Sequence, residues 1–309
     1  MQNSDCQLQS KGMMLPPGWY VVLESSEVVS KKPLAFTRFG LPLVAWRNSE
    51  NKVVVQSNIC PHRGAKLSLG SIKNGRIVCP FHGFEFSQDG HCAFLPEIQK
   101  PAPGLKIKRY ETFEFAGWIW LKWRDEECQQ LKPTWFKQAP EKLYTYRFSE
   151  LWPVHFTRSV ENQLDFSHLP FVHRTSIGRF SKAGQYPKTD MSETGIKFYF
   201  GDPEKSFVEM LFPNIWINYI SPKYMLSLAF APVDDNHTKL YLQGHRAHLT
   251  WPPFSWLANA FDRAINKWVL SQDRKVVTSQ EPQNSLLASE TLMKSDELIR
   301  HFRKWLLAK

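Results

Sequence analysis

Two short segments of the sequence each carry one cysteine and one histidine. Cys60 and His62 form a C-x-H pair, and Cys79 and His82 form a C-x-x-H pair farther along the chain. Zinc accepts two thiolates and two imidazoles, although zinc fingers usually take both cysteines from one loop and both histidines from a helix. One cysteine and one histidine per loop suits a [2Fe–2S] cluster in which thiolates bind one iron and imidazoles the other. The segments predict a metal site and favour such a cluster over zinc.

A second candidate site follows at His168 and His173. On an unbroken helix the two rings would point about 140° apart. Pro170 predicts a break, because a helix normally ends at or before the residue that precedes a proline. We therefore expect His168 on the last turn of a helix, with Asn162 and Asp165 on the same face, and His173 brought back by the bend that follows. Two imidazoles and a carboxylate form the facial triad of non-haem Fe(II) oxygenases; ordinary helix-end histidines are the alternative.

The carboxylate of such a triad must come from elsewhere in the chain. A long helix is expected over about 254 to 279, and three acids in or near it are candidates: Asp262, Asp273 and Glu281. Charged residues on a helix are mostly solvated, and spacing alone leaves the choice open.

The first pair of segments resembles a known motif. Residues 60–64 (Cys-Pro-His-Arg-Gly) and 79–83 (Cys-Pro-Phe-His-Gly) look like the Rieske cluster-binding motif. The resemblance implies a [2Fe–2S] cluster, with one iron on both cysteines and the other on both histidines, inside an all-β Rieske domain. The other cysteines, Cys6, Cys92 and Cys128, match nothing and are expected to be packing or surface residues.

The second site extends the resemblance to the whole chain. Asn-x-x-Asp-x-x-His-x₄-His, which begins at Asn162, looks like the iron motif of Rieske non-haem iron oxygenases, the ring-hydroxylating α-subunit family. The resemblance implies a mononuclear Fe(II) on His168 and His173, and the segment from Gln272 to Val277 resembles the family's third-ligand segment, which favours Asp273.

The same resemblance assigns a catalytic role to Asp165. The matching acid in the family hydrogen-bonds an iron-ligand histidine of its own subunit and a cluster histidine of the neighbouring subunit, within a head-to-tail homotrimer. Asp165 is therefore expected to serve electron transfer and orientation rather than ligation. Asn162 is a further candidate beside the ligands, whereas His155 is expected to be a packed or hydrogen-bonded residue.

The elements that must position these residues divide into two halves. Strand-length apolar segments separated by turn residues predict an all-β module over residues 15–125. A polar, proline-containing stretch at 125–142 marks the expected boundary. Strands and helices mix over 140–309, and an antiparallel sheet wrapped by helices, helix-grip-like by the resemblance, is expected for this catalytic domain. The fold class is thus α+β.

Three helices are expected in the second half. The first spans about 156 to 169 and the second 254 to 279. The third runs from 296 to 307 behind Ser295 as N-cap, with one apolar face. Its apolar residues are Leu298, Ile299, Phe302, Trp305 and Leu306.

Composition limits the classes of protein. The chain has 309 residues, a formal charge of +10 and basic residues dispersed along it, which speaks against a nucleic-acid partner. Five cysteines are an odd, sparse set, typical of reduced thiols in a cytoplasmic protein. We expect neither a signal peptide nor a membrane span.

A cluster beside a mononuclear iron favours a terminal oxygenase that uses O₂ to hydroxylate or oxidatively demethylate a small organic substrate, with monooxygenation favoured over dioxygenation. The glycines form no G-x-G sequence, so NAD(P)H must be oxidised by a separate reductase or ferredoxin. The alternatives are a non-catalytic Rieske electron carrier with a C-terminal binding domain and a zinc-stabilised structural protein. Six strand residues are candidates for the substrate pocket: Trp216, Asn218, Tyr219, Met225, Leu228 and Phe230.

Overall fold

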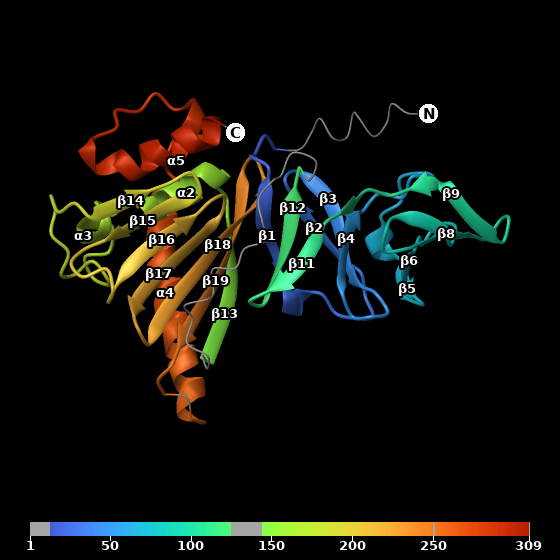
Figure 1. The fold of residues 1–309 in the computed structure, drawn as a ribbon, viewed down its shortest axis with the longest axis horizontal. Helices are drawn as coiled ribbons and strands as arrows, with labels where there is room; N and C mark the ends of the chain where they lie inside the picture. Colours follow the sequence, from blue (N-terminus) through green and yellow to red (C-terminus); the bar gives the residue numbers. More distant parts are fainter. Residues whose placement is uncertain (1–12, 125–143, 250, 309) are drawn as a thin grey trace. The chain divides into compact units, whose positions relative to one another are not determined.

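The computed structural model describes residues 13–124, 144–249 and 251–308 (Figure 1). The chain divides into two compact units, residues 1–133 and 134–309. The expected boundary at 125–142, together with Cys6 and Cys128, lies outside the described residues, and the domain bounds 15–125 and 140–309 stay a prediction. No described helix is both long and apolar enough to cross a membrane.

The first unit is built from strands in three antiparallel sheets. One sheet has the order β1-β12-β11, the second β10-β4-β3-β2 and the third β5-β6-β7-β8-β9. The strands are β1 (Gly18–Glu24), β2 (Leu34–Arg38), β3 (Leu41–Arg47), β4 (Val53–Ser57), β5 (Ser71–Lys73), β6 (Arg76–Val78), β7 (Glu85–Phe86), β8 (His91–Leu95), β9 (Lys100–Lys106), β10 (Arg109–Tyr110), β11 (Thr112–Phe115) and β12 (Trp118–Trp123). Short 3₁₀ turns lie at Ser25–Glu27 and Leu67–Leu69. The strands are rich in Val, Trp and Phe, which suit a half-buried pleated surface.

One hydrophobic core of this unit contains cysteines. Cys60, Cys79 and Cys92 are buried in it with Trp46 and Phe86, among other apolar side chains. The expectation that Cys92 is a packing residue is therefore confirmed. The two candidate ligand thiols, Cys60 and Cys79, are thus held in place by packing in this core.

The second unit is a seven-stranded antiparallel sheet with helices. The strand order is β13-β19-β18-β17-β16-β15-β14. The strands are β13 (Tyr144–Trp152), β14 (Lys188–Met191), β15 (Gly195–Tyr199), β16 (Phe207–Leu211), β17 (Ile215–Ser221), β18 (Tyr224–Asp234) and β19 (His237–Arg246). The helices are α2 (Phe156–Leu164), α3 (Leu169–Val172), α4 (Phe254–Val277) and α5 (Glu297–Leu307), with 3₁₀ turns at Ser285–Leu287 and Lys294–Asp296. The expected α+β fold class is confirmed.

The long helix α4 covers one face of this sheet. Tyr146 of β13 points toward α4, because its hydroxyl accepts a hydrogen bond from Asn266 at 2.7 Å. Gly244 lies opposite Tyr146, and a Cβ at Gly244 would sit 2.1 Å from the tyrosine ring. Only glycine therefore lets Tyr146 lie across the sheet toward the helix.

Strand register decides which pocket candidates face α4. Leu226 pairs with Gly244 and with Asn218, so Asn218 shares the α4 side, as do Trp216, Leu228 and Phe230 by the alternation of side chains. Tyr219 and Met225 pair with each other one position along from the Asn218–Leu226 pair, so their side chains point to the other face. The expectation that Tyr219 and Met225 line the same pocket as the other four is wrong, since they point to the opposite face.

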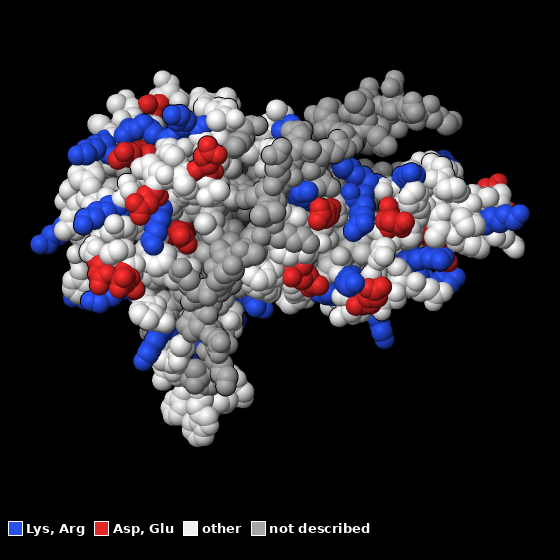
Figure 2. Space-filling view, in the orientation of Figure 1, with Lys and Arg blue, Asp and Glu red and all other residues white. Residues whose placement is uncertain are grey.

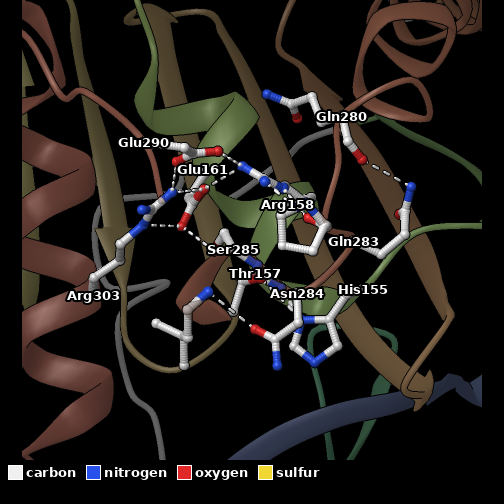
Figure 3. A network of polar contacts seen from close by, with 12 residues as sticks. His155, Thr157, Arg158, Glu161, Gln280, Gln283, Asn284, Ser285, Glu290 and Arg303 are labelled. Carbon is white, nitrogen blue, oxygen red and sulfur yellow. Dashed lines mark hydrogen bonds and ion pairs between the residues drawn. The ribbon is translucent and has the colours of Figure 1, made fainter. Parts of the chain in front are cut away.

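Helices α2 and α5 are joined by a charge network that is buried at Arg158 and Glu161 (Figure 3). Glu161 of α2 accepts two hydrogen bonds from Arg303 of α5, at 2.7 and 2.8 Å, and a third from Ser285. Arg158, only 2% exposed, pairs with Glu290 at 2.6 Å. Arg303 also reaches Glu290 at 2.7 Å, so the two arginines and two glutamates form one closed network. Such a network stabilises the helix contact only while every member keeps its partner.

The N-terminus of α5 differs from the expected one. Asp296, not Ser295, is the N-cap, and no side chain caps the helix, because the preceding Lys294–Asp296 turn already leads into it. The expected apolar face is confirmed: Leu298, Ile299, Phe302 and Leu306 are buried, and Trp305 stacks on Phe212.

We expect Glu161→Ala to destabilise the second unit by about 3 kcal/mol, because Arg158 and Arg303 would lose their buried carboxylate and share Glu290 alone. Urea unfolding followed by circular dichroism measures the loss. Glu50→Ala is the matched control, since Glu50 pairs with the exposed Lys52, and its unfolding midpoint should stay at the wild-type value. Equal midpoints for both variants would contradict the role given to the buried network.

Candidate iron centres

The structure brings His168, His173 and Asp273 together. Asp273 Oδ1 lies 2.9 Å from His173 Nε2 and 3.4 Å from His168 Nε2. Among the described residues, these three form the group whose ligand atoms all lie within 4.8 Å of one another. His173 and Asp273 are buried, and His168 is half-buried. Two imidazoles and one carboxylate converge on one point, which is the donor set of a facial triad.

The segment before the triad folds differently from the expected helix. Helix α2 ends at Leu164, and Asp165 is extended with φ −84° and ψ 104°. Its carboxylate accepts hydrogen bonds from the backbone N–H and the hydroxyl of Ser167, at 2.8 and 2.6 Å. This local turn competes with the helix and ends it. The expectation that Asn162, Asp165 and His168 share one helical face, with His168 on its last turn, is wrong.

The two histidines instead flank the short helix α3. His168 is its N-cap and His173 its C-cap, and the N–H of His173 bonds the carbonyl of Leu169 at 3.1 Å. Pro170 stands in the first turn of α3, where its missing N–H costs nothing, so it starts a helix rather than ending one. One turn of helix brings both rings to the same side.

Gly178 holds the chain close behind this turn. Its N–H bonds the carbonyl of His173 at 3.0 Å, and a Cβ added to it would lie 1.9 Å from the carbonyl oxygen of Leu169. A side chain there would displace α3. Sequence reasoning missed this glycine, because nothing in its spacing connects it to the histidines.

Helix α4 contacts both nitrogens of the His173 ring. Asp273 lies next to Nε2, and Oε1 of the preceding residue, Gln272, lies 2.8 Å from Nδ1. Ser176 donates its hydroxyl proton to the same amide oxygen at 2.7 Å. With the oxygen of Gln272 facing both groups, Nδ1 of His173 donates a hydrogen bond to it, and Nε2 is the ring nitrogen that faces Asp273. Gln272 and Ser176 were also missed; an amide beside a candidate ligand was the available signal for Gln272.

The other acids lie elsewhere. Asp262 pairs with Arg246 at 2.8 Å, and Glu281 is exposed in the loop after α4. The Asp165 carboxylate approaches His168 Nδ1 at 3.6 Å. Asn162 is half-buried, and its amide nitrogen has no hydrogen-bond partner within the described ranges. His155 accepts a hydrogen bond from the N–H of Thr157 as the N-cap of α2, which confirms its expected structural role.

The electrostatics of the triad fit a cation. Burial opposes charge on His168, but the carboxylates of Asp165 and Asp273 outweigh it and raise the pKa of His168 to about 9. Burial likewise opposes the charge on Asp273, yet both histidines lower the pKa of its carboxyl. Among the residues that the structure describes, neither Asp273 Oδ1 nor His168 Nδ1 has a hydrogen-bond partner, and both atoms are buried. A metal ion at this point would give the carboxylate of Asp273 a partner of opposite charge. It would also displace a proton from His168, because a histidine must be deprotonated at the nitrogen that binds a metal.

The two cysteine segments of the first unit have the same backbone design. The N–H of Gly64 bonds the carbonyl of Cys60 at 2.9 Å, and the N–H of Gly83 bonds that of Cys79 at 3.0 Å. Both glycines have positive φ, +73° and +70°, which side chains rarely adopt. Each loop thereby curls its own cysteine and histidine toward the other loop.

The ligand candidates of this site face opposite environments. Cys60 and Cys79 are buried, whereas His62 and His82 are exposed, with ring centroids 4.6 Å apart. Burial and the neighbouring Cys79 raise the pKa of Cys60 to about 11, so a bound metal ion would have to displace the thiol proton. Within the described part of the chain, these four residues do not form a group compact enough for one ion. A buried pair of cysteines and an exposed pair of histidines suit a two-iron cluster better than a single zinc.

The fold and the two sites define a class: an iron–sulfur β domain and a sheet-and-helix domain with a His₂-carboxylate centre, joined in one chain. Family models agree with both halves. The model for the Rieske [2Fe-2S] domain matches residues 18–112, and the model for the vanillate O-demethylase oxygenase C-terminal domain matches residues 152–215. The chain belongs to the Rieske non-haem iron oxygenases. It therefore binds a Rieske [2Fe–2S] cluster and a mononuclear iron.

Individual relatives cover the chain to different extents. Methylxanthine N1-demethylase NdmA of Pseudomonas putida is 26% identical, over 92% of this chain and 84% of its own length. The solved structure of NdmA has a TM-score of 0.82, with 94% of this chain and 88% of that chain covered at 25% identity. Aminopyrrolnitrin oxygenase PrnD of Pseudomonas fluorescens is 31% identical over 54% of this chain. The chain spans about half the length of that relative (48%).

We expect Gln272→Leu to weaken metal binding at the triad by about 10–100-fold, because the His173 ring would lose the acceptor that fixes its proton on Nδ1. Titration of metal-stripped protein with Co²⁺, followed by the visible absorption of the bound ion, measures the affinity.

Thr175→Val is the matched control, since Thr175 contacts only the other end of the same amide, at a weak 3.5 Å. Its Co²⁺ affinity should equal that of the wild type. An unchanged affinity in Gln272→Leu would show that the amide does not orient His173.

Proposed function

We propose that the protein is a terminal oxygenase that uses O₂ and electrons from a separate ferredoxin or NAD(P)H-dependent reductase to oxidise a small organic substrate. The observation that carries the proposal is the convergence of His168, His173 and Asp273 on one point. A Rieske electron carrier would need the cluster but not this triad. The triad therefore favours an enzyme over the non-catalytic alternative.

In this proposal His168, His173 and Asp273 hold the mononuclear iron, and Cys60, Cys79, His62 and His82 hold the cluster. Three protein ligands leave coordination positions open for O₂. When bound, the iron supplies O₂ activation and the cluster supplies electrons one at a time. The chain's own task is to fix the ligand rings, and Gln272 performs it at His173 by accepting a hydrogen bond from Nδ1–H.

Asp165 has the matching task at His168. Its carboxylate lies 3.6 Å from Nδ1 of that ring, and Ser167 orients it through two hydrogen bonds. Burial opposes its charge, but His168 and Ser167 lower the pKa of Asp165, so it stays an anion that holds the ring proton on Nδ1. We further propose that Asp165 accepts a hydrogen bond from a cluster histidine of a neighbouring subunit in a head-to-tail homotrimer, which would give electrons a short route to the iron. Asn162, with its free amide nitrogen, is proposed as a catalytic residue beside this route.

The substrate is proposed to bind on the face of the sheet that α4 covers. This face presents Trp216, Asn218, Leu228 and Phe230, so most of its surface is apolar. The indole nitrogen of Trp216 is buried and finds no hydrogen-bond partner in the described part of the chain. An apolar ring or chain that carries one hydrogen-bond acceptor would satisfy it.

Monooxygenation is proposed as hydroxylation or oxidative demethylation. The support is the kind of relative: NdmA is a methylxanthine N1-demethylase and PrnD an aminopyrrolnitrin oxygenase. A cytoplasmic location belongs to the same proposal and rests on the sparse, odd set of cysteines. No nucleic-acid partner is proposed, since the basic residues are dispersed.

His168→Ala tests the proposal. We expect this variant to lose the mononuclear iron and all substrate oxidation while the visible spectrum of the cluster stays unchanged, because His168 and the cluster ligands belong to different domains. Iron analysis after removal of loosely bound metal, beside the visible spectrum, measures both centres.

His237→Ala is the control, because His237 pairs with Asp234 at the end of a strand and contacts neither centre. It should keep both centres. A full complement of mononuclear iron in His168→Ala, or loss of the cluster in that variant, would overturn the ligand assignment.

A further inference from the structure

The outer face of α4 is apolar, although it is the exposed one. Phe254, Leu257, Phe261 and Trp268 follow one another at spacings of three, four and seven residues, which places them on one side of the helix. Their exposed fractions are 53%, 66%, 65% and 47%. Trp251 and Trp256, 73% and 70% exposed, lie at the start of the helix, and Trp256 is on the flank of α4 that also carries Arg263 and Lys267. We call these six residues the α4 stripe.

The inner face of the same half of α4 is polar. Asn259 and Asp262 bind Arg246, and Asn266 binds Tyr146. A helix on the surface of a globular protein normally has the reverse pattern, with the apolar side inward. Six large apolar side chains together on the surface indicate a binding surface rather than chance exposure.

The exposed charged residues in this half of α4 have one sign. Arg263 and Lys267 of α4 are exposed beside the α4 stripe, and Lys223 is exposed in a turn that hydrogen-bonds Ala247 just before the helix. The acid of this half of the helix, Asp262, is neutralised by Arg246. This half of α4 extends beyond the sheet in Figure 1, and Figure 2 shows its uncovered surface in white without acidic side chains.

We propose that the α4 stripe binds the surface of an anionic lipid bilayer. Tryptophan and phenylalanine on one side with lysine and arginine beside them are the side chains of an interfacial helix. A two-fold symmetric contact between copies fits less well, because it would bring Arg263 and Lys267 of both copies together. The stripe and Asp273 lie on the same helix, with Phe261 roughly 18 Å from Asp273 along the axis.

Co-sedimentation of the full-length holoprotein with vesicles tests the proposal. We expect binding to vesicles of phosphatidylcholine and phosphatidylglycerol in equal parts, much weaker binding to phosphatidylcholine alone, and release by salt. Trp256→Ser/Phe261→Ser should lower binding at least about tenfold, since two large apolar side chains would no longer leave water. Arg263→Glu/Lys267→Glu should lower binding to the anionic vesicles by about tenfold or more.

Leu287→Ser/Met293→Ser is the matched control, because these residues are as exposed (76% and 63%) but lie before α5. It should bind as the wild type does, and all variants should keep the wild-type melting temperature. Absence of wild-type binding would overturn the proposal. So would a stripe variant that dissociates a wild-type oligomer while vesicles bind neither protein, which would make the stripe a contact between copies. Neither result depends on the iron centres or on the oxygenase activity.

Discussion

The buried carboxylate of Asp273 is the group on which the catalytic domain depends. A lone carboxylate in a protein interior costs several kcal/mol unless opposite charge and hydrogen bonds compensate it. Here the compensation comes from two imidazoles, one of which keeps its proton up to about pH 9 in the absence of a metal. An iron ion in place of that proton would leave the same carboxylate with a doubly charged partner. The geometry of α3, the close approach at Gly178 and the Gln272 contact all bring groups to this one atom.

The two histidines of the triad are held in different ways. His168 has an anionic neighbour, Asp165, behind it, whereas His173 has a neutral amide, Gln272. A carboxylate makes the ring it contacts a stronger donor to metal than an amide does. The triad is therefore electrostatically asymmetric, and its anionic neighbour lies at His168.

Local spacing pointed to the candidate ligands that lie close in sequence, although only the resemblance favoured iron ligands over ordinary helix-end histidines at His168 and His173. The cysteine and histidine of each cluster loop are at most three positions apart, and His168 and His173 flank a single helical turn. Asp273 could not be chosen from spacing, because it meets His173 from a helix far along the chain, and only the resemblance singled it out. The end of α2 was misplaced because Ser167 offers Asp165 a local hydrogen bond that competes with the helix. Tyr219 and Met225 were put in the wrong layer because strand register, which decides the face, is a tertiary property.

The most direct test of the proposed oxygenase is the iron and acid-labile sulfide content of the anaerobically purified protein, with electron paramagnetic resonance spectra before and after dithionite reduction. The two-centre assignment predicts about three irons and about two sulfides per chain, with a Rieske signal after reduction. About two irons and two sulfides, unchanged after Fe(II) reconstitution, would contradict it and leave an electron carrier.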